Sequence, residues 1–371
     1  MIDWDNLIYE EFNKDNLKNL YSDIFKLNNI NLYNLLELLK NIINTNKMEN
    51  MNKALNRTIK SIYKKENITI YGDYDVDGIC STSIIVEFLR KVNAKVSYYI
   101  PDRISEGYGL SINSIKELCK FKTKLLITVD CGTLSIDEIN YANQKGIDVI
   151  IIDHHKTENK IHPKAFAILN PFCYNYENEE IYKNLCACGL SFVFIFNLYN
   201  LLLKDDNIKV YNIKIESFLD LTMLATIADI MPMTYINRLI ISIGIKILKY
   251  RTRVCFKNLC DKSFLNLKYI NEKDIAFNII PKINSTGRID DAKVALNWLL
   301  SNNKENVEKL TNKLIELNKN RQDIQYKVFL EADKCIKDKK LYNNSIIVVY
   351  NNKWHPGVIG IVAGKLIEKY E

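Results

Sequence analysis

The sequence lacks the segments that mark exported, membrane-spanning or disulfide-rich proteins. Its first residues, MIDWDNLIYEEF, are acidic and polar, whereas a secretory signal begins basic and continues apolar. The longest apolar run, Phe192 to Leu203, is interrupted by Asn197 and Asn200 and does not predict a membrane span. The nine cysteines form no CxxC pair, so neither a disulfide framework nor a zinc site is predicted. We therefore expect a cytoplasmic globular protein with no membrane partner.

Histidine is scarce and the net charge is small. Only four histidines occur in 371 residues, and two of them, His154 and His155, are adjacent. The net charge of +7 is compatible with a polyanionic partner, but it is spread over the whole chain and identifies none. With 47% hydrophobic residues, the chain is long enough for two domains with their own cores.

Short β-rich runs alternate with helical stretches in the central part of the chain. The runs are ITIY, KVSYYI, KLLITV, DVIIID and FAIL. Helical periodicity at 81–92 and 136–145, between such runs, predicts right-handed βαβ units and a parallel α/β sheet. Apolar helical segments at 188–203 and 215–228 follow, and we expect them to cover one face of that sheet.

The two ends of the chain show mainly helical patterns, unlike the alternating strands and helices of the central part. Apolar residues at helical spacing in 1–65 predict a helical N-terminal extension. A stretch without Gly or Pro at 304–337 predicts one long connector helix, followed by a strand SIIVVY and a helix at 358–369. Because one strand and one helix cannot bury an apolar face, we expect the chain to be truncated within a second domain. The expected divisions are 1–65, 66–235, 236–340 and 341–371.

Acidic residues and histidines stand at the ends of the predicted strands. They are Asp73, Asp75, Asp77, Asp130, Asp153, His154 and His155, joined by Asp229 after the helix LTMLATIA. In an open parallel sheet, ligands bind at the carboxyl ends of the strands. Carboxylates crowded together repel one another unless cations neutralise them, and an oxygen-rich set with imidazole suits Mn²⁺ or Mg²⁺. So many carboxylates predict two ions.

Each feature alone also has a structural explanation. The DxDxDG run opens calcium loops, but the twelfth position is Ile84 instead of Glu, and a strand precedes. Asp130 could cap a helix and Asp229 could end a turn. Two adjacent histidines after a buried strand are harder to explain, because one of them would be buried without a partner. Taken together, the DxDxDG run, Asp130, the histidine pair and Asp229 favour a metal site over these separate explanations.

Four motifs in this order resemble those of the DHH phosphoesterase superfamily: GDYDVDG, VDCG, DHH and ATIADIMP. Three further segments are similar to RecJ-type single-strand DNA exonucleases: PDRISEGYG, PKINSTGRIDDA and WHPGVIGIVAGKLIEKY. The resemblance extends over residues 66–371. It implies a parallel-sheet DHH domain with helices on both faces, joined by a long connector helix to the start of a second α/β (DHHA1) domain.

The resemblance also implies two divalent cations, with Mn²⁺ preferred over Mg²⁺. The implied ligands are Asp73, Asp75, Asp77, Asp130, His154 and Asp229. Asp75 and Asp77 would hold one ion each, and Asp130 would bridge the two. His154 and Asp229 would complete the second site. Tyr71 stands where many members of the superfamily have a histidine, which makes Asp73 the less regular ligand.

The implied reaction is hydrolysis without a covalent enzyme intermediate, in which the cations activate water. His155, together with Asp130 and Asp77, would be catalytic, with His155 stabilising charge on the scissile phosphate. Asp153 would orient its neighbours. Arg103 and Arg288, which alone could equally be surface arginines, would contact substrate phosphate, as would His355 before a helix.

The function that the resemblance implies is 5′-to-3′ exonuclease action on single-stranded DNA in recombination and repair. Single-strand-binding protein and a helicase are further partners that it suggests. One alternative is a DHH phosphodiesterase acting on short oligonucleotides or cyclic dinucleotides, although GDYDVDG and EGYG are more typical of RecJ. Another is a non-catalytic, replication-associated relative. The sequence argues against it, because every expected carboxylate ligand is present. We expect residues 1–371 alone to bind metal but to digest DNA weakly.

Overall fold

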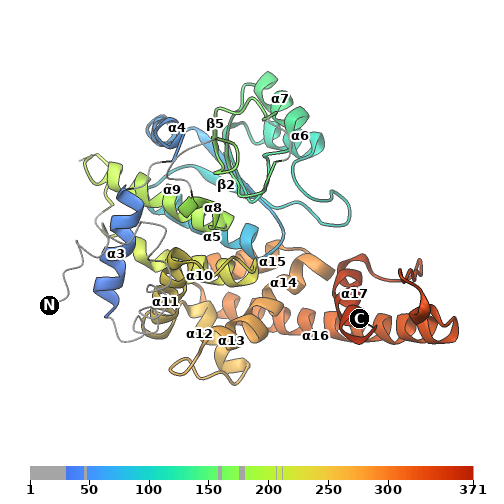
Figure 1. Ribbon diagram of the computed structural model, residues 1–371. Coiled ribbons are helices and arrows are strands. Elements are labelled where there is room, and N and C mark those ends of the chain that lie inside the picture. The colour runs from blue at the N-terminus through green and yellow to red at the C-terminus, as the bar shows by residue number, and fades with distance from the viewer. Residues whose placement is uncertain are drawn as a thin grey trace, which may run out of the picture.

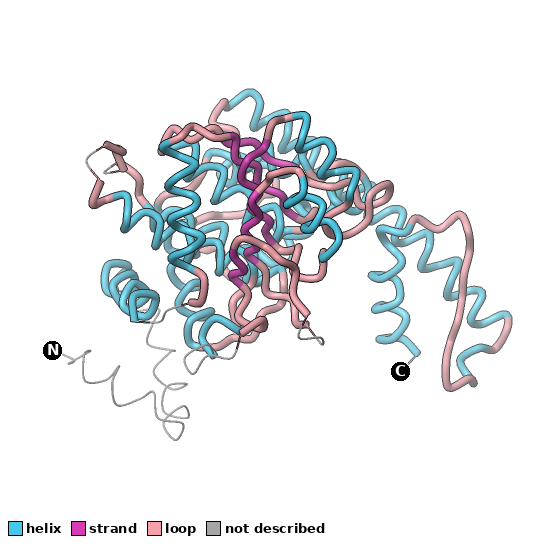
Figure 2. Tube along the Cα trace, turned by 90° about the horizontal axis from the view of Figure 1, so that it is seen from above, coloured by secondary structure: helices cyan, strands magenta, loops and turns pink. Residues whose placement is uncertain are grey.

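The five predicted strands are confirmed in a computed structural model, which describes residues 31–45, 48–157, 161–174, 180–205, 207–210 and 212–370. They are β1 (Asn67–Gly72), β2 (Val96–Tyr99), β3 (Thr123–Val129), β4 (Asp148–Ile152) and β5 (Ala167–Leu169). All pair in parallel, in the order β2-β1-β3-β4-β5. The sheet lies at the centre of the larger part of the molecule (Figure 2), which establishes the α/β class.

Helices cover both faces of this sheet, as predicted (Figure 1). On one face lie α6 (Ile112–Lys120) and α7 (Ile136–Gln144). The other face holds α4 (Met51–Tyr63), α5 (Val76–Lys91) and α9 (Ala187–Leu202), with α10 (Leu219–Ala228) packed on α5 and α9. Strands β1, β3 and β4 are buried on both faces, which explains why they read as continuous apolar runs.

Helix α5 begins at Val76, five residues before the predicted start at 81. The Asp75 side chain caps it, because its Oδ1 accepts hydrogen bonds from the backbone N–H groups of Asp77 (2.9 Å) and Gly78 (3.1 Å). A Cβ on Gly78 would lie 2.5 Å from the backbone oxygen of Asp73, so only glycine lets the helix start so close to the acidic loop. Two candidate ligands therefore belong to the first turn of α5.

A second group of helices lies beyond α5 and α10. Those that contact α5 or α10 are α11 (Tyr235–Tyr250), a π-helical turn η3 (Ile275–Ile279), α14 (Ile280–Ile289) and α15 (Lys293–Leu300). Packed on these or on one another are α3 (Leu32–Thr45), α12 (Val254–Lys262), α13 (Glu272–Asp274), α16 (Lys304–Asp338) and α17 (Pro356–Tyr370). Short segments α8 (Glu180–Lys183), η2 (Ile215–Phe218) and η4 (Leu341–Asn343) complete the described helices. None of the helices described is long and apolar enough to cross a membrane.

Helix α16 confirms the predicted long helix and joins two hydrophobic clusters. Val307 and Leu314, in its first half, belong to the main core. In its second half, Val328 packs in a separate small cluster with Val358 and Val362 of α17. Figure 1 shows this second half and α17 extending away from the sheet. The division into domains at 236 and 341 remains a prediction.

The predicted strand SIIVVY is wrong. Residues 345–350 form no strand, and Ile346 (77% exposed), Val348 (71%) and Tyr350 (89%) face solvent. A strand needs the backbone of a neighbouring strand to pair with, and none lies beside this segment in the described part of the chain. The apolar pattern alone could not reveal that the partner was missing.

The described residues of the predicted N-terminal extension form the helices α3 and α4, and α4 is built into the sheet domain. Arg57 of α4 donates to the carboxylates of Glu66 and Asp148 and to the backbone oxygen of Lys124. These groups lie near the amino-terminal ends of β1, β3 and β4. Helix α4 therefore fixes the end of the sheet opposite to the predicted site; residues 1–30 lie outside the described residues.

A largely buried ion network ties together the helices that carry Asp77 and Asp229 at their ends. Arg253, at the start of α12, donates to Asp220 of α10 (2.7 Å) and to Glu87 of α5 (2.6 Å). The Asp220 side chain is 2% exposed, so its charge depends on this partner. The network holds α5 and α10 side by side.

We expect Arg253→Met to lower the free energy of unfolding by about 3 kcal/mol, because it leaves the buried Asp220 carboxylate without its counter-charge, whereas Glu87 keeps its pair with Lys91. Chemical denaturation measures this. Arg251→Met is the matched control: Arg251 pairs with Glu216 at the surface, where such a pair contributes less than about 1 kcal/mol. Equal losses in the two variants would contradict a special role for the network.

Candidate metal centre

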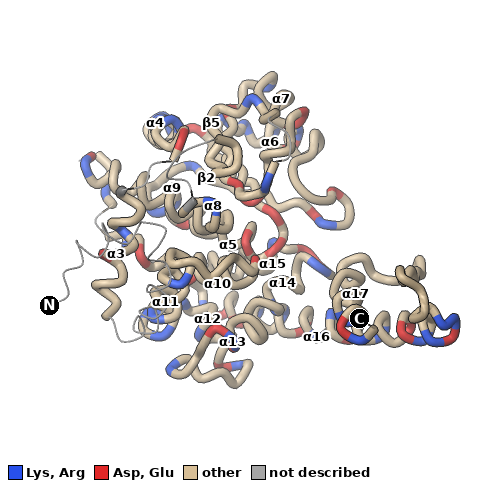
Figure 3. Tube along the Cα trace, in the orientation of Figure 1, with Lys and Arg blue, Asp and Glu red and all other residues tan. Residues whose placement is uncertain are grey.

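The strand order reverses between β1 and β3, because β2 lies on one side of β1 and β3, β4 and β5 lie on the other. Open α/β sheets bind ligands beyond the carboxyl ends of the strands at such a point. Asp73 follows β1, Asp130 follows β3, and His154 and His155 lie beyond β4. Acidic positions gather there, beside the start of α5 (Figure 3). The predicted residues do converge.

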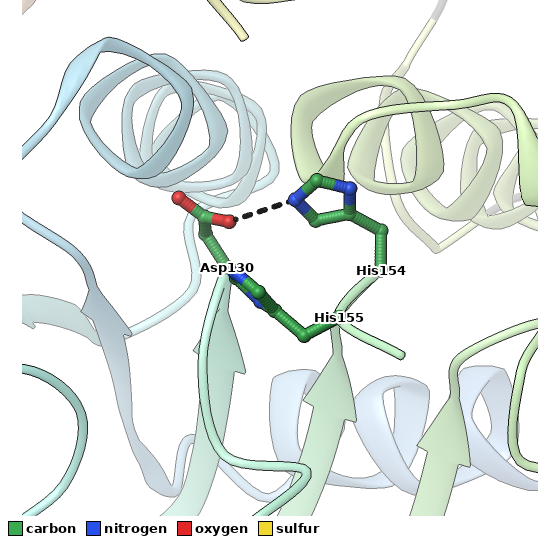
Figure 4. A group of neighbouring side chains, drawn as sticks. All are labelled: Asp130, His154 and His155. Carbon is green, nitrogen blue, oxygen red and sulfur yellow. Dashed lines mark ion pairs between the residues drawn. The ribbon is translucent and has the colours of Figure 1, made fainter. Parts of the chain in front are cut away.

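Seven side chains provide potential ligand atoms in three overlapping groups. The groups are Asp73, Asp75 and Asp130; Asp77, His154 and Asp229; and Asp130, His154 and His155, each with its ligand atoms within 4.8 Å of one another. Asp130 belongs to two groups, and its Oδ1 lies 3.2 Å from the Nε2 of His154 (Figure 4). The same Nε2 lies 3.7 Å from Asp77 and 3.6 Å from Asp229.

Asp77 is held by the amino terminus of α9. Its two carboxylate oxygens accept hydrogen bonds from the backbone N–H groups of Ala187 (2.7 Å) and Cys188 (2.8 Å). These N–H groups have no partner within the helix, and the positive end of the helix dipole favours the ionised carboxylate. A segment more than a hundred residues away in the chain thus orients this candidate ligand.

Asp153 points away from the acidic group and organises the loop after β4. It accepts hydrogen bonds from the backbone N–H groups of Thr133 (3.1 Å) and His154 (2.8 Å), and lies 2.7 Å from the Nδ1 of His155. Although burial opposes it, hydrogen bonding from His155 lowers the pKa of the Asp153 carboxyl, and the same contact raises the pKa of His155. Asp153 therefore has the orienting geometry expected of it.

Burial and mutual repulsion make the ionised carboxylates costly. Burial, then the charge of Asp75, raises the pKa of Asp73 to about 7. Burial raises the pKa of Asp77 to about 6, and it raises the pKa values of Asp130 and Asp229 as well. Cations placed among these oxygens would remove that cost.

One buried carboxylate oxygen of the acidic group has no hydrogen-bond partner. It is Oδ1 of Asp73, which no donor in the described part of the chain reaches. A buried carboxylate oxygen without a partner is costly, and a bound cation would satisfy it. The donor set, mostly carboxylate oxygen with imidazole and no thiolate, fits Mn²⁺ or Mg²⁺.

Tyr71, at the position where the family resemblance leads us to expect a histidine, lies outside the acidic group. Its ring is fully buried in the cluster on the α6 and α7 side of the sheet and stacks on Tyr99, with ring centroids 5.2 Å apart. The hydroxyl donates to the backbone oxygen of Gly109 (2.9 Å). Tyr71 therefore supports a loop and offers no ligand atom.

A cavity of about 350 Å³ opens onto the acidic group. Two of the predicted phosphate contacts, Arg103 and Arg288, line it. The Arg103 guanidinium lies 4.9 Å from the centre of the Tyr74 ring, and Arg288 donates to the backbone oxygen of Gly357 (3.2 Å). Both arginines therefore lie beside the carboxylates, and the partners that their guanidinium groups contact, an aromatic ring and a backbone oxygen, are uncharged.

His355 does not line this cavity. It borders a separate groove with Ile289, Lys313 and Lys327, and its Nδ1 accepts a hydrogen bond from the Gly357 N–H (3.1 Å). That bond occupies one of the backbone N–H groups that we expected to hold an anion. The structure therefore gives no support to this part of the prediction, and a contact of His355 with substrate stays untested.

Several residues that line or support the site were not predicted from the sequence. Tyr108 and Asn284 line the cavity, and the Oδ1 of Asn284 accepts a hydrogen bond from Val76 N–H (3.2 Å) at the start of α5. Asn170, after β5, donates to Thr133 Oγ1 and to the backbone oxygen of His155, both at 3.0 Å. Tyr108 and Asn284 lie in segments that resemble RecJ, PDRISEGYG and PKINSTGRIDDA, and this resemblance was the only signal that could have pointed to them.

The chain is similar to proteins of known activity. Residues 67–226 match the DHH family, N-terminal domain. The single-stranded-DNA-specific exonuclease RecJ of Bacillus subtilis is 34% identical over 330 residues, which cover 87% of this chain and 39% of the relative. This chain thus spans about two fifths of that relative's length.

Solved structures agree with these sequence relationships. An exonuclease RecJ bound to manganese has 26% identity and a TM-score of 0.73, over 88% of this chain and 79% of that one. RecJ of Thermus thermophilus in complex with Mn²⁺ has 25% identity and a TM-score of 0.72, over 87% of this chain and 45% of that one. Divalent cations thus occur in proteins of this fold and similar sequence.

Proposed function

We propose that the chain hydrolyses phosphodiester bonds of single-stranded DNA from the 5′ end, because residues 67–226 match the DHH family, N-terminal domain, and the chain is similar to RecJ exonucleases. The observation that carries this proposal is the convergence of five carboxylates and two histidines at one centre, part of which lines a cavity together with two arginines. A non-catalytic relative would have no need for so costly a concentration of buried charge.

The chain's own residues suit this reaction. Two divalent cations, held by Asp73, Asp75, Asp130 and by Asp77, His154, Asp229, would supply an activated water and charge compensation. His155, whose Nδ1 lies against Asp153, would donate from Nε2 to a phosphate oxygen. Burial of most of the carboxylates keeps bulk water away from the charges and strengthens their interactions. We propose Mn²⁺ over Mg²⁺ on the RecJ resemblance, and a cytoplasmic location with single-strand-binding protein and a helicase as partners.

The direct test is release of nucleotides from a single-stranded oligonucleotide. We expect Mn²⁺-dependent release of mononucleotides, beginning with a 5′ label and reaching a 3′ label last, and little release from the matching duplex. EDTA and His155→Ala should each abolish it. Equal release by wild type and His155→Ala without added metal would refute the proposal, and early release of a 3′ label would refute the polarity.

The arginines are proposed to hold the phosphates of the strand. Burial, then repulsion from Arg103 and Arg321, lowers the pKa of Arg288, so a bound phosphate would relieve crowding of positive charge there. Arg321 is itself held by the amide oxygens of Gln325 and Asn318, both at 2.6 Å, and has no carboxylate partner in those contacts. Arg103 and Arg288 at the cavity, with Arg321 near Arg288, form a group of positive charges that fits a polyanion better than a single small anion.

We expect Arg288→Gln to raise KM for an oligonucleotide by roughly tenfold or more, because a charged hydrogen bond to phosphate contributes about 1.5–3 kcal/mol. The kcat value should change less, since the metal ligands are untouched. Steady-state kinetics measures both constants. Arg90→Gln, at an exposed position near the end of α5, is the matched control; an equal change in KM there would assign the effect to net charge alone.

A further inference from the structure

Asp130, the carboxylate shared by two candidate ligand groups, has a backbone conformation that its residue type rarely adopts. Its φ angle is 60°, in the left-handed region, which costs a non-glycine residue about 1 kcal/mol or more. The conformation turns the chain sharply after β3. Such a conformation persists only where neighbouring groups hold it.

Two hydrogen bonds hold the backbone of Asp130 in place. Its N–H donates to the backbone oxygen of Ile152 in β4 (3.0 Å). Its carbonyl oxygen accepts from the hydroxyl of Tyr108 (3.0 Å). The first bond continues the sheet, whereas the second comes from a side chain in the loop between β2 and α6. The tyrosine hydroxyl is therefore the contact that closes this turn from outside the sheet.

The loop that carries Tyr108 is itself anchored on both sides. Gly107 and Gly109 have φ angles of 81° and 83°, which only glycine adopts easily, and they present the tyrosine between them. Tyr71 donates from the sheet to the backbone oxygen of Gly109. On the other side, Glu106 accepts from the Tyr99 hydroxyl (2.8 Å) and the Asp102 N–H (2.9 Å). The position of the Tyr108 hydroxyl is thus fixed by the loop as well as by its own bond.

The same hydroxyl also meets His155. It lies 3.2 Å from Nδ1 and 3.4 Å from Nε2, and the two rings pack edge to face with centroids 5.7 Å apart. One side chain of the β2–α6 loop therefore contacts both the backbone of the shared carboxylate and the histidine proposed to face the phosphate.

We propose that Tyr108 is a positioning residue of the metal centre, and that Tyr71 supports it through Gly109. The hydroxyl of Tyr108 holds Asp130 in its strained conformation, so that the carboxylate reaches both ligand groups, and it limits the rotation of the His155 ring. Tyr71, which stands where many members of the superfamily have a histidine, supports the loop through its bond to Gly109. This inference rests on the proposed function only where enzyme kinetics are used to test it, since cation binding can be measured separately.

The test is Tyr108→Phe in the full chain, with Tyr98→Phe as matched control. Tyr98 also loses one hydroxyl bond, to Asn297 (2.6 Å), but it does not line the cavity at the acidic group. Tyr108 is 52% exposed, so losing its hydroxyl should lower the melting temperature in EDTA by no more than Tyr98→Phe does. We expect Mn²⁺ affinity, measured by the electron paramagnetic resonance signal of free Mn²⁺, to fall about tenfold, within the range for groups that orient ligands.

The kinetic arm separates positioning from substrate contact. We expect Tyr108→Phe to lower kcat by about tenfold and to leave KM for the oligonucleotide within about twofold, with Tyr98→Phe unchanged in both. Wild-type Mn²⁺ affinity and kcat in Tyr108→Phe would overturn the inference, as would a change confined to KM or a loss of melting temperature in EDTA larger than that of Tyr98→Phe. Should the wild-type chain cleave no DNA, the proposed function fails, while the Mn²⁺ titration still decides the role of Tyr108.

Discussion

Asp130→Asn is expected to lower Mn²⁺-dependent release of nucleotides by more than about a hundredfold, beyond the loss typical of groups that only orient ligands. Asp130 is the one carboxylate that belongs to two of the candidate ligand groups, so the substitution weakens both. Asparagine has the same shape and tolerates the left-handed backbone conformation that Asp130 adopts (φ 60°). The variant therefore removes charge and one ligand oxygen while retaining the local fold.

The stability of this variant distinguishes loss of chemistry from loss of structure. Burial, then the charge of Asp77, raises the pKa of Asp130, so its ionised form destabilises the metal-free protein. Asp130→Asn should accordingly melt at the same or a higher temperature than wild type in EDTA. Asp137→Asn, on the exposed side of α7, is the control and should match wild type in both activity and melting temperature. A variant that melts early, or that retains activity, would contradict the assignment.

The sheet and most of the acidic centre could be predicted because both depend on local patterns. Strands buried on two faces are continuous apolar runs, and the residue that follows such a run lies at the edge where parallel strands end. Asp73, Asp130 and His154 were found by this rule alone. Asp229 was found from its place at the end of a helix, and only the family resemblance tied it to the others.

What the sequence did not reveal depends on contacts between distant segments. Nothing near Asp77 in the chain indicates that the N–H groups of Ala187 and Cys188 hold it. The bond from Tyr108 to the Asp130 backbone likewise crosses from the β2–α6 loop to the end of β3. For the segment 345–350 the strand prediction was wrong for a related reason: its pattern is β-rich, but no strand lies beside it in the described residues to pair with it.

The acidic centre predicts how cations and pH together set the stability of the fold. The pKa values of Asp73 (about 7) and Asp77 (about 6) are raised above their usual range in the folded protein, chiefly by burial. The folded state then binds more protons than the unfolded state between about pH 4 and pH 7. Without metal, stability should fall as pH rises through this window, because the buried carboxylates must ionise next to one another.

Bound cations remove that repulsion and bind best when the carboxylates are ionised. We therefore expect Mn²⁺ to raise the melting temperature more at pH 8 than at pH 5.5. At a concentration a hundred times Kd, one bound ion stabilises the folded state by about 2.7 kcal/mol. Differential scanning fluorimetry with Mn²⁺ or EDTA at both pH values measures the effect, and Asp130→Asn should reduce it while Asp137→Asn should not. An equal rise at the two pH values would mean that Mn²⁺ binds elsewhere than among these carboxylates.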